Sequence, residues 1–369
     1  MTDGRPLVLV HPAPQRRDRI FTPVAWQRLQ QHFTVVDLEA DPDPEAFRAA
    51  LPEAFAIVGQ PDLPAAALRQ AGRLKAILNV EGNFFPNVDY PTAFAQGVRV
   101  LGCGTAYAQA VAEFALVLAL DLARGITRED RAARGGRERY VSAGNADAIL
   151  LRHASIGLLG YGNLGRALHP LLQPFQPTIR VYDPWLPDAV LRDAGLQPAT
   201  LAETLRHAQF LFVLATATAE SEHLLNSSTL ALLPDQARVV LVSRANVADY
   251  DAVLEFVRAG RVLAGIDVWP EEPIPADSPF RQEEGVIISG HRAGGIPEAF
   301  LSIGDMVCDD LELIARGLPP ARLQAAAPEL VGRYRNRPVG WPSGSVTAAL
   351  PRPTPPLTTD RRLFDTRAR

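Results

Sequence analysis

The sequence predicts an α/β fold made of two doubly wound parallel-sheet domains. Short apolar strands alternate with helical segments along most of the chain, and one strand near the middle runs into a helix through a glycine-rich turn. Such alternation is typical of parallel sheets covered by helices on both faces. At 369 residues the chain is long enough for two domains of ordinary size with complete cores.

The first part of the chain, residues 1–103, carries this alternation without a glycine fingerprint. The expected strands are 7–10, 34–38, 56–59, 74–80 and 98–101, with helices at 23–32, 44–50 and 64–71. The loop 80–87 follows the carboxyl end of a strand, which is where open α/β sheets bind their ligands. This loop is therefore a candidate binding segment.

One long helix is expected at 105–124, because apolar residues recur at helical spacing and Gly125 follows as a stop signal. It is apolar on more than one face, which predicts a position between the two halves. Its longest apolar run, 111–122, is interrupted by two carboxylates and is too short to span a bilayer. The arginine-rich segment 124–139 that follows is either a solvated arm or a contact with a second subunit.

The glycine-rich turn follows the expected strand 155–159 and has the spacing G-x-G-x-x-G at Gly160, Gly162 and Gly165. Gly160 permits a tight turn, Gly162 lets the backbone approach a pyrophosphate, and Gly165 lets the helix lie close to the strand. The positive end of that helix favours a phosphate group. Strand, glycines and helix occur in the order that a dinucleotide-binding site requires.

A second strand, 178–182, ends on Asp183, 23 residues after Gly160. A carboxylate at this point accepts hydrogen bonds from the hydroxyls of an adenosine ribose and repels a 2′-phosphate. The sequence therefore predicts NAD as the cofactor, in preference to NADP.

The chain continues with strands at 210–214, 239–242, 263–268 and 286–289, which join the two preceding strands in a six-stranded sheet. A last helix at 297–316 leads back toward the first half. Beyond residue 326 the chain is rich in proline and poor in apolar residues, so 326–369 is expected to be an irregular tail.

Three polar residues stand near strand ends of the second half: Arg244, Glu272 and His291. An arginine can bind a carboxylate and a neighbouring carbonyl at the same time. A histidine hydrogen-bonded to a carboxylate is held in one tautomer and can act as a general acid toward a carbonyl. Together they suit the reduction of a 2-oxo acid. Each alone also fits an ordinary role, as a surface ion pair, a loop carboxylate or a capping histidine.

Charge and cysteine content disfavour several classes of protein. The formal net charge of −4 argues against a general nucleic-acid or membrane-surface binder, which would need a basic face. Cys103 and Cys308 cannot form a disulfide framework, and neither has metal-ligand spacing with the seven histidines, so no metal site is expected. No signal peptide is visible at the N-terminus, and a reducing cytoplasm fits these features.

These motifs resemble those of the D-isomer-specific 2-hydroxyacid dehydrogenases, a family that includes glyoxylate and hydroxypyruvate reductases and phosphoglycerate dehydrogenase. The likeness runs from about residue 74 to residue 316. It is carried by the start of the long helix (110–113), the cofactor fingerprint (157–184), the arginine motif (243–249), the glutamate motif (265–273) and the histidine motif (291–295).

The resemblance implies a role for each matched residue. Arg244 would bind and polarise the substrate, and Glu272 would support His291, which exchanges the proton while NADH exchanges the hydride. The other implied cofactor contacts are Asn163 and Leu164 at the pyrophosphate, Asp267 at the nicotinamide carboxamide, and Thr216, Val242, Ser243 and Gly294 along the groove. The implied substrate contacts are the backbone of Gly82 and Asn83, with Glu81 and Tyr107 beside them.

The resemblance also implies an architecture. Both chain ends (1–103 plus 293–325) would form a flavodoxin-like substrate domain, and a Rossmann NAD-binding domain (104–292) would be inserted between them. Two subunits would pair through the inserted domain as a homodimer. The remaining partners would be small 2-oxo and 2-hydroxy acids.

Several positions depart from the family pattern. Residues that usually line the nicotinamide side of the groove are replaced by Leu214, Thr216, Leu241 and Ala245. Arg292 is either a second anion contact or part of a structural ion pair. In the substrate loop, Glu81 would repel an anionic substrate unless it accepts hydrogen bonds, so we expect a polar, hydroxylated 2-oxo acid rather than pyruvate. A catalytically silent NAD-sensing scaffold or corepressor-like protein on the same fold is the alternative.

Overall fold

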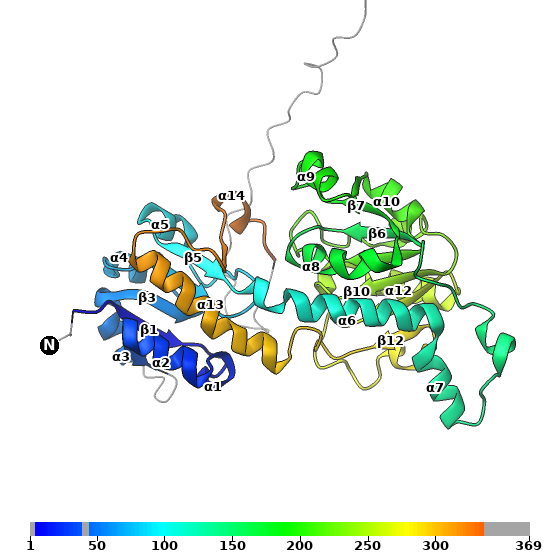
Figure 1. Ribbon diagram of the computed structural model, residues 1–369, viewed down its shortest axis with the longest axis horizontal. Coiled ribbons are helices and arrows are strands. Elements are labelled where there is room, and N and C mark those ends of the chain that lie inside the picture. The colour runs from blue at the N-terminus through cyan, green and yellow to red at the C-terminus, as the bar shows by residue number, and fades with distance from the viewer. Residues whose placement is uncertain (1–3, 39–43, 336–369) are drawn as a thin grey trace, which may run out of the picture.

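The computed structural model describes residues 4–38 and 44–335, which form two α/β lobes side by side (Figure 1). The long helix α6 (Gly104–Arg124) runs from the first lobe along the second, and α13 (Pro297–Ala315) returns to the first. The expected α/β class with two parallel-sheet domains is confirmed.

The first lobe contains a six-stranded sheet in the order β13-β5-β4-β3-β1-β2. Its strands are β1 (Leu7–His11), β2 (Thr34–Asp37), β3 (Ala54–Gly59), β4 (Ala76–Asn79), β5 (Arg99–Gly102) and β13 (Gln324–Ala325). The first five pair in parallel, in the 2-1-3-4-5 order of flavodoxin-like sheets, whereas β13 pairs antiparallel with β5. The helices of this lobe are α1 (Arg17–Ile20), α2 (Pro23–His32), α3 (Pro44–Ala50), α4 (Ala65–Gln70) and α5 (Tyr90–Ala95), with α13 packed on α1 and α2.

The second lobe contains a seven-stranded sheet in the order β12-β11-β10-β9-β6-β7-β8, all parallel. Its strands are β6 (Ser155–Leu159), β7 (Thr178–Tyr182), β8 (Gln197–Pro198), β9 (Phe210–Val213), β10 (Ala237–Leu241), β11 (Val262–Ile266) and β12 (Val286–Ile288). The sequence predicted six strands, and that number is wrong. A two-residue strand such as β8 is too short to produce a periodic pattern.

The helices of the second lobe, besides α6, are α7 (Ile126–Arg134), α8 (Asn163–Leu172), α9 (Asp188–Asp193), α10 (Leu201–His207), α11 (Ser227–Leu230) and α12 (Tyr250–Arg258). Short 3₁₀ turns lie at Leu51–Glu53, Val141–Asn145, Gln173–Phe175, Ala245–Val247 and Pro279–Gln282. The strand order reverses between β6 and β9, which is the point where doubly wound sheets bind their ligands.

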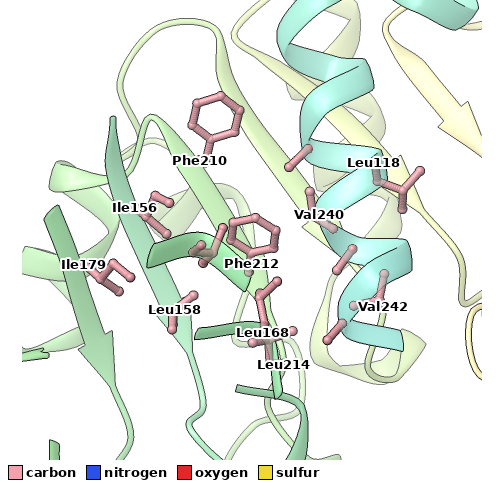
Figure 2. Close-up of a cluster of buried hydrophobic side chains, with 14 of the residues drawn as sticks. Leu118, Ile156, Leu158, Leu168, Ile179, Phe210, Phe212, Leu214, Val240 and Val242 are labelled. Carbon is pink, nitrogen blue, oxygen red and sulfur yellow. The ribbon is translucent and has the colours of Figure 1, made fainter. Parts of the chain in front are cut away.

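A buried apolar cluster holds the central strands of the second sheet against α6 (Figure 2). Phe210 and Phe212 of β9 are fully buried and lie beside Ile156 and Leu158 of β6, while Leu118 reaches the cluster from α6. Truncation of one such phenylalanine to alanine costs about 3–5 kcal/mol. This packing fixes the ends of β6 and β9, from which the glycine-rich turn and the facing loop emerge.

Helix α6 lies at the junction of the lobes and buries one face, while Val117 on the other face is 61% exposed. It contacts α8, β10 and β11 on one side and α13 on the other, and it ends where Gly125 adopts the left-handed conformation (φ 65°). At 21 residues it is long and apolar enough to cross a membrane, contrary to the expectation from its apolar run. Core helices of soluble proteins pass the same test, so this is weak evidence for a span.

Residues 326–335, the described part of the expected irregular tail, include one four-residue helix. Residues Pro328–Val331 form α14, and Ala326, Val331 and Tyr334 pack against the apolar core of the first lobe. These side chains are only partly buried, and proline content does not reveal their contact with that core. Residues 336–369 of the predicted tail lie outside the described residues.

Candidate active site

A cavity of about 670 Å³ lies between the lobes, lined by loops at the carboxyl ends of strands from both sheets. The catalytic, cofactor and substrate residues that the resemblance implies all line this cavity except Gly165, whereas Leu241, Ala245 and Arg292 do not line it. The fold thus brings together side chains that are more than 200 residues apart, from Glu81 to His291.

The glycine-rich turn joins β6 to α8 at the floor of the cavity. Gly160 has φ 96°, and a Cβ on it would lie 3.0 Å from the backbone nitrogen of Ala215 in the facing loop. A Cβ on Gly165 would lie 2.9 Å from the carbonyl oxygen of Gly160, so this glycine packs the helix against the strand and does not face the cavity. Gly162 has open space beside it, which leaves the backbone accessible to a ligand.

Asp183 is held at the end of β7 by two backbone donors. Its Oδ2 accepts a hydrogen bond from the Tyr161 amide (2.8 Å), and its Oδ1 accepts one from the Trp185 amide (3.0 Å). Each carboxylate oxygen can accept a further bond, so the group remains able to bind hydroxyls of a ligand.

Ser243 carries a polar atom that the protein leaves unpartnered. Its Oγ is buried and has no hydrogen-bond partner among the described residues, and Ser243 lines the cavity. Buried hydroxyls rarely stay unpaired, so a ligand is the expected partner. This hydroxyl, the open backbone at Gly162 and the Asp183 carboxylate fit a bound dinucleotide.

His291 and Glu272 form a hydrogen-bonded pair on the cavity wall. His291 Nδ1 lies 2.8 Å from Glu272 Oε2, and Glu272 Oε1 accepts a hydrogen bond from the Trp269 amide (3.0 Å). Burial raises the pKa of Glu272, but the bonds from His291 and Trp269 outweigh it, and the pKa lies below its ordinary value. The group is therefore a carboxylate that accepts from Nδ1, which leaves Nε2 to exchange a proton.

Asp267 holds the loop that carries His291. Its carboxylate accepts hydrogen bonds from the amides of Arg292 (3.0 Å) and Ala293 (3.1 Å), and its backbone carbonyl accepts from the His291 amide (2.7 Å). His291 itself has φ 49°, a conformation that non-glycine residues seldom adopt. The resemblance suggested a nicotinamide contact for Asp267 and did not reveal this positioning role.

Arg244 follows β10 and reaches toward the substrate loop of the first lobe. Its Nη1 donates to the carbonyl of Ser243 (2.6 Å), and its Nη2 lies against the side-chain amide of Asn83. Burial lowers the pKa of the Arg244 guanidinium, and the Glu81 and Glu272 carboxylates offset this only in part. An arginine with these neighbours stays charged at neutral pH.

The substrate loop is shaped by Asn79, the last residue of β4. Its side chain donates to the carbonyl of Asn83 (2.9 Å) and accepts from the amide of Glu81 (2.9 Å). Neither the Gly82 amide nor the Asn83 amide donates a hydrogen bond within the described residues. Two neighbouring free amides can bind a carboxylate.

Tyr107 of α6 forms another part of the wall. Its hydroxyl donates to the carbonyl of Val80 (3.0 Å), and its ring packs edge-on against Phe300 at a centroid distance of 5.5 Å. Burial raises the pKa of Tyr107, so the phenol stays neutral. The tyrosine positions the loop instead of offering a charge.

Sequence reasoning missed several residues that line the cavity. Gln15 and Arg19 follow β1, and the Arg19 guanidinium lies 3.8 Å from the Phe300 ring centroid. The carboxyl end of the first strand could have indicated them, since such ends border the ligand cleft. Gln324, Leu330 and Tyr334 also line the cavity, and no motif marks them.

No group of three or more histidine, cysteine or carboxylate side chains that could hold a metal occurs within residues 4–38 and 44–335. The fold and the cavity are those of a two-lobed dinucleotide-binding protein whose site holds an arginine and a hydrogen-bonded histidine–carboxylate pair.

Comparison with known proteins narrows this class. The family model of the NAD binding domain of D-isomer specific 2-hydroxyacid dehydrogenases matches residues 116–293. A crystal structure of a phosphoglycerate oxidoreductase from Rhizobium etli is 40% identical, covers 88% of this chain and 99% of its own, and has a TM-score of 0.79. The chain belongs to the D-isomer-specific 2-hydroxyacid dehydrogenase family, as the sequence motifs suggested.

Curated relatives are more distant. D-3-phosphoglycerate dehydrogenase of Archaeoglobus fulgidus is 27% identical over 269 residues, 72% of this chain and 50% of that protein. Glyoxylate reductase of Korarchaeum cryptofilum is 27% identical over 241 residues, 64% of this chain and 72% of that protein. The chain spans about half the length of the phosphoglycerate dehydrogenases it matches.

Proposed function

We propose that this protein is an NAD-dependent oxidoreductase that interconverts a small, polar 2-oxo acid and its D-2-hydroxy acid. The observation that carries the proposal is that Arg244, the His291–Glu272 pair and two free amides of the substrate loop line one cavity with the glycine-rich turn. Membership of the dehydrogenase family supports it.

The chain's own residues would act on the substrate as follows. The amides of Gly82 and Asn83 bind the carboxylate, and the Arg244 guanidinium binds the carboxylate and the 2-oxo group together. His291 Nε2 donates the proton to the developing alkoxide and removes it in the reverse direction. Glu272 stabilises the imidazolium through Nδ1. NADH, when bound, supplies the hydride.

The substrate is proposed to carry a hydroxyl or another polar group beyond its 2-oxo acid. Glu81 is buried in the cavity wall next to the free amides, where a carboxylate disfavours a purely apolar substrate tail. Turnover of hydroxypyruvate, glyoxylate and pyruvate, compared by kcat/KM, tests this. A clear preference for pyruvate would contradict it.

We propose that NADH is preferred over NADPH because Asp183 lies where a 2′-phosphate would be repelled. Asp183→Asn should lower the ratio of the Kd for NADPH to the Kd for NADH by about tenfold, because it removes one repulsive charge. Fluorescence titration with both cofactors measures the ratio. An unchanged ratio would remove Asp183 as the determinant.

We also propose that the protein is a homodimer that acts in the cytoplasm. Large apolar side chains are exposed on α6 and on the arm after it, namely Val117, Ile126, Tyr140, Val141 and Leu150. Helix α7 buries none of its residues. An arm with this much exposed apolar surface favours the subunit contact over the solvated arm. Light scattering gives the mass in solution, and a monomer at micromolar concentration would contradict the dimer.

The decisive experiment follows NADH absorbance while the protein is incubated with a panel of 2-oxo acids. Oxidation of NADH by at least one of them is the expected result. NADH binding without oxidation by any substrate would instead favour the silent scaffold.

A further inference from the structure

The C-terminal segment 328–335, called the strap here, crosses from the first lobe to the second. The chain leaves β13, which is paired with β5, and reaches the loop that follows β9. There the Ala219 amide donates to the Arg333 carbonyl (3.2 Å), and the Arg335 amide donates to the Ala217 carbonyl (3.0 Å). The strap is therefore hydrogen-bonded to the cofactor lobe through its backbone.

Tyr334 occupies the centre of this crossing. Its ring centroid lies 5.7 Å from that of Phe84 in the first lobe and 6.4 Å from that of Trp185 in the second. All three rings line the cavity. The strap thus places an aromatic face between the lobes.

The end of the cavity that Tyr334 reaches can be identified from its neighbours. Trp185 stands two residues after Asp183, and in doubly wound sheets the carboxylate after the second strand binds the adenosine ribose. Thr218, paired with Tyr334 in a β-bridge, follows β9 and also lines the cavity. The Trp185 side of Tyr334 therefore lies at the adenosine end of the cavity, while Phe84 on its other side belongs to the substrate loop.

We propose that the strap forms the outer wall of the adenosine site and that Tyr334 binds the adenine of NAD(H) through its ring. The inference rests on the proposed use of NAD. An aromatic ring offers a stacking surface to adenine and needs no hydrogen-bond pattern. The proposal places the adenosine half of the cofactor against the strap and assigns the nicotinamide half no contact with Tyr334.

Titration of NADH and of reduced nicotinamide mononucleotide, which lacks the adenosine, tests the proposal in the full chain. Tyr334→Ala should weaken NADH binding by about tenfold or more, the scale of one base–aromatic stack, and leave mononucleotide binding unchanged. Tyr334→Phe should keep the affinity because it retains the ring.

Arg73→Ala is the control, because it removes an exposed ion pair with Glu53 (3.1 Å) that does not line the cavity and should not change either affinity. Unchanged NADH binding in Tyr334→Ala would overturn the proposal. Equal weakening of both ligands would also overturn it, since that would show a general loosening of the lobes. Tighter NADH binding in Tyr334→Ala would overturn it as well, because it would show that the strap blocks the site. These binding measurements do not depend on turnover, so they test the role of Tyr334 separately from the proposed reaction.

Discussion

The two lobes are built alike but bring different groups to the cavity. Both have a parallel sheet whose strand ends face the cleft. The second lobe contributes Arg244 and the Glu272–His291 pair, whereas the first contributes free backbone amides, the buried Glu81 and Arg19. The comparison shows that both sheets position loops in the same way and that the residues of the strand-end loops determine which groups reach the cavity. Changes in the second lobe should stop the reaction, and changes in the first should alter substrate choice.

The largest effect is expected from His291→Ala. Loss of the general acid should lower kcat by about 10²–10⁴-fold, while Kd for NADH stays the same because the cofactor contacts are intact. Stopped-flow turnover and fluorescence titration measure the two quantities. His32→Ala, a first-lobe surface histidine, is the control. Retention of kcat within tenfold in His291→Ala would contradict the assigned role.

The second-largest effect is expected from Arg244→Ala. Loss of a charge-assisted hydrogen bond to the substrate should lower kcat/KM by about 10–10²-fold, mainly through KM. Arg292→Ala is the matched control, because Arg292 is in the same lobe but does not line the cavity. A similar loss in both variants would point to a general charge effect instead of a specific contact.

Glu272→Gln should have a smaller effect on catalysis, about tenfold in kcat/KM, because the neutral amide stabilises the imidazolium less well. It should also change the pH dependence of stability. Because the pKa of Glu272 is below its ordinary value of 4.5 in the folded protein, its stabilising contribution is present above pH 4.5 and is lost as pH falls further. The gap in Tm between the wild type and Glu272→Gln should therefore narrow below pH 4.5. A gap that is constant with pH would argue against the lowered pKa.

The smallest effect concerns the first lobe. Glu81→Gln should raise KM for hydroxypyruvate by about two- to tenfold and lower it for pyruvate, with kcat for the preferred substrate nearly unchanged. Steady-state kinetics with both substrates measures the shift. A collapse of kcat would show that the first lobe takes part in the chemistry and would break the contrast between the lobes.

The sequence predicted most of the fold because the relevant signals are local. The strand before Gly160, the glycine spacing and the carboxylate at Asp183 lie within one short βαβ unit, and the structure forms that unit as expected. Prediction from the sequence failed where an element is too short to show a period or depends on contacts with residues far along the chain. The two-residue β8 has no period, and α14 owes its order to packing against the first lobe.

The site shows the same difference between local signals and contacts that are distant in sequence. The sequence by itself determined the residue types at the strand ends. Through its motifs it also indicated the family and a candidate residue for nearly every role. Such motifs can be recognised because their residues are neighbours along the chain. Only the tertiary structure decided that Glu272 and His291 are 2.8 Å apart, that Asp267 holds the histidine loop, and that Tyr334 spans the lobes. These contacts join residues that are distant in sequence. The contacts of Glu272 and Asp267 exist because the loops after the neighbouring strands β11 and β12 meet at one edge of the second sheet. Those of Tyr334 exist because the two sheets face one cavity.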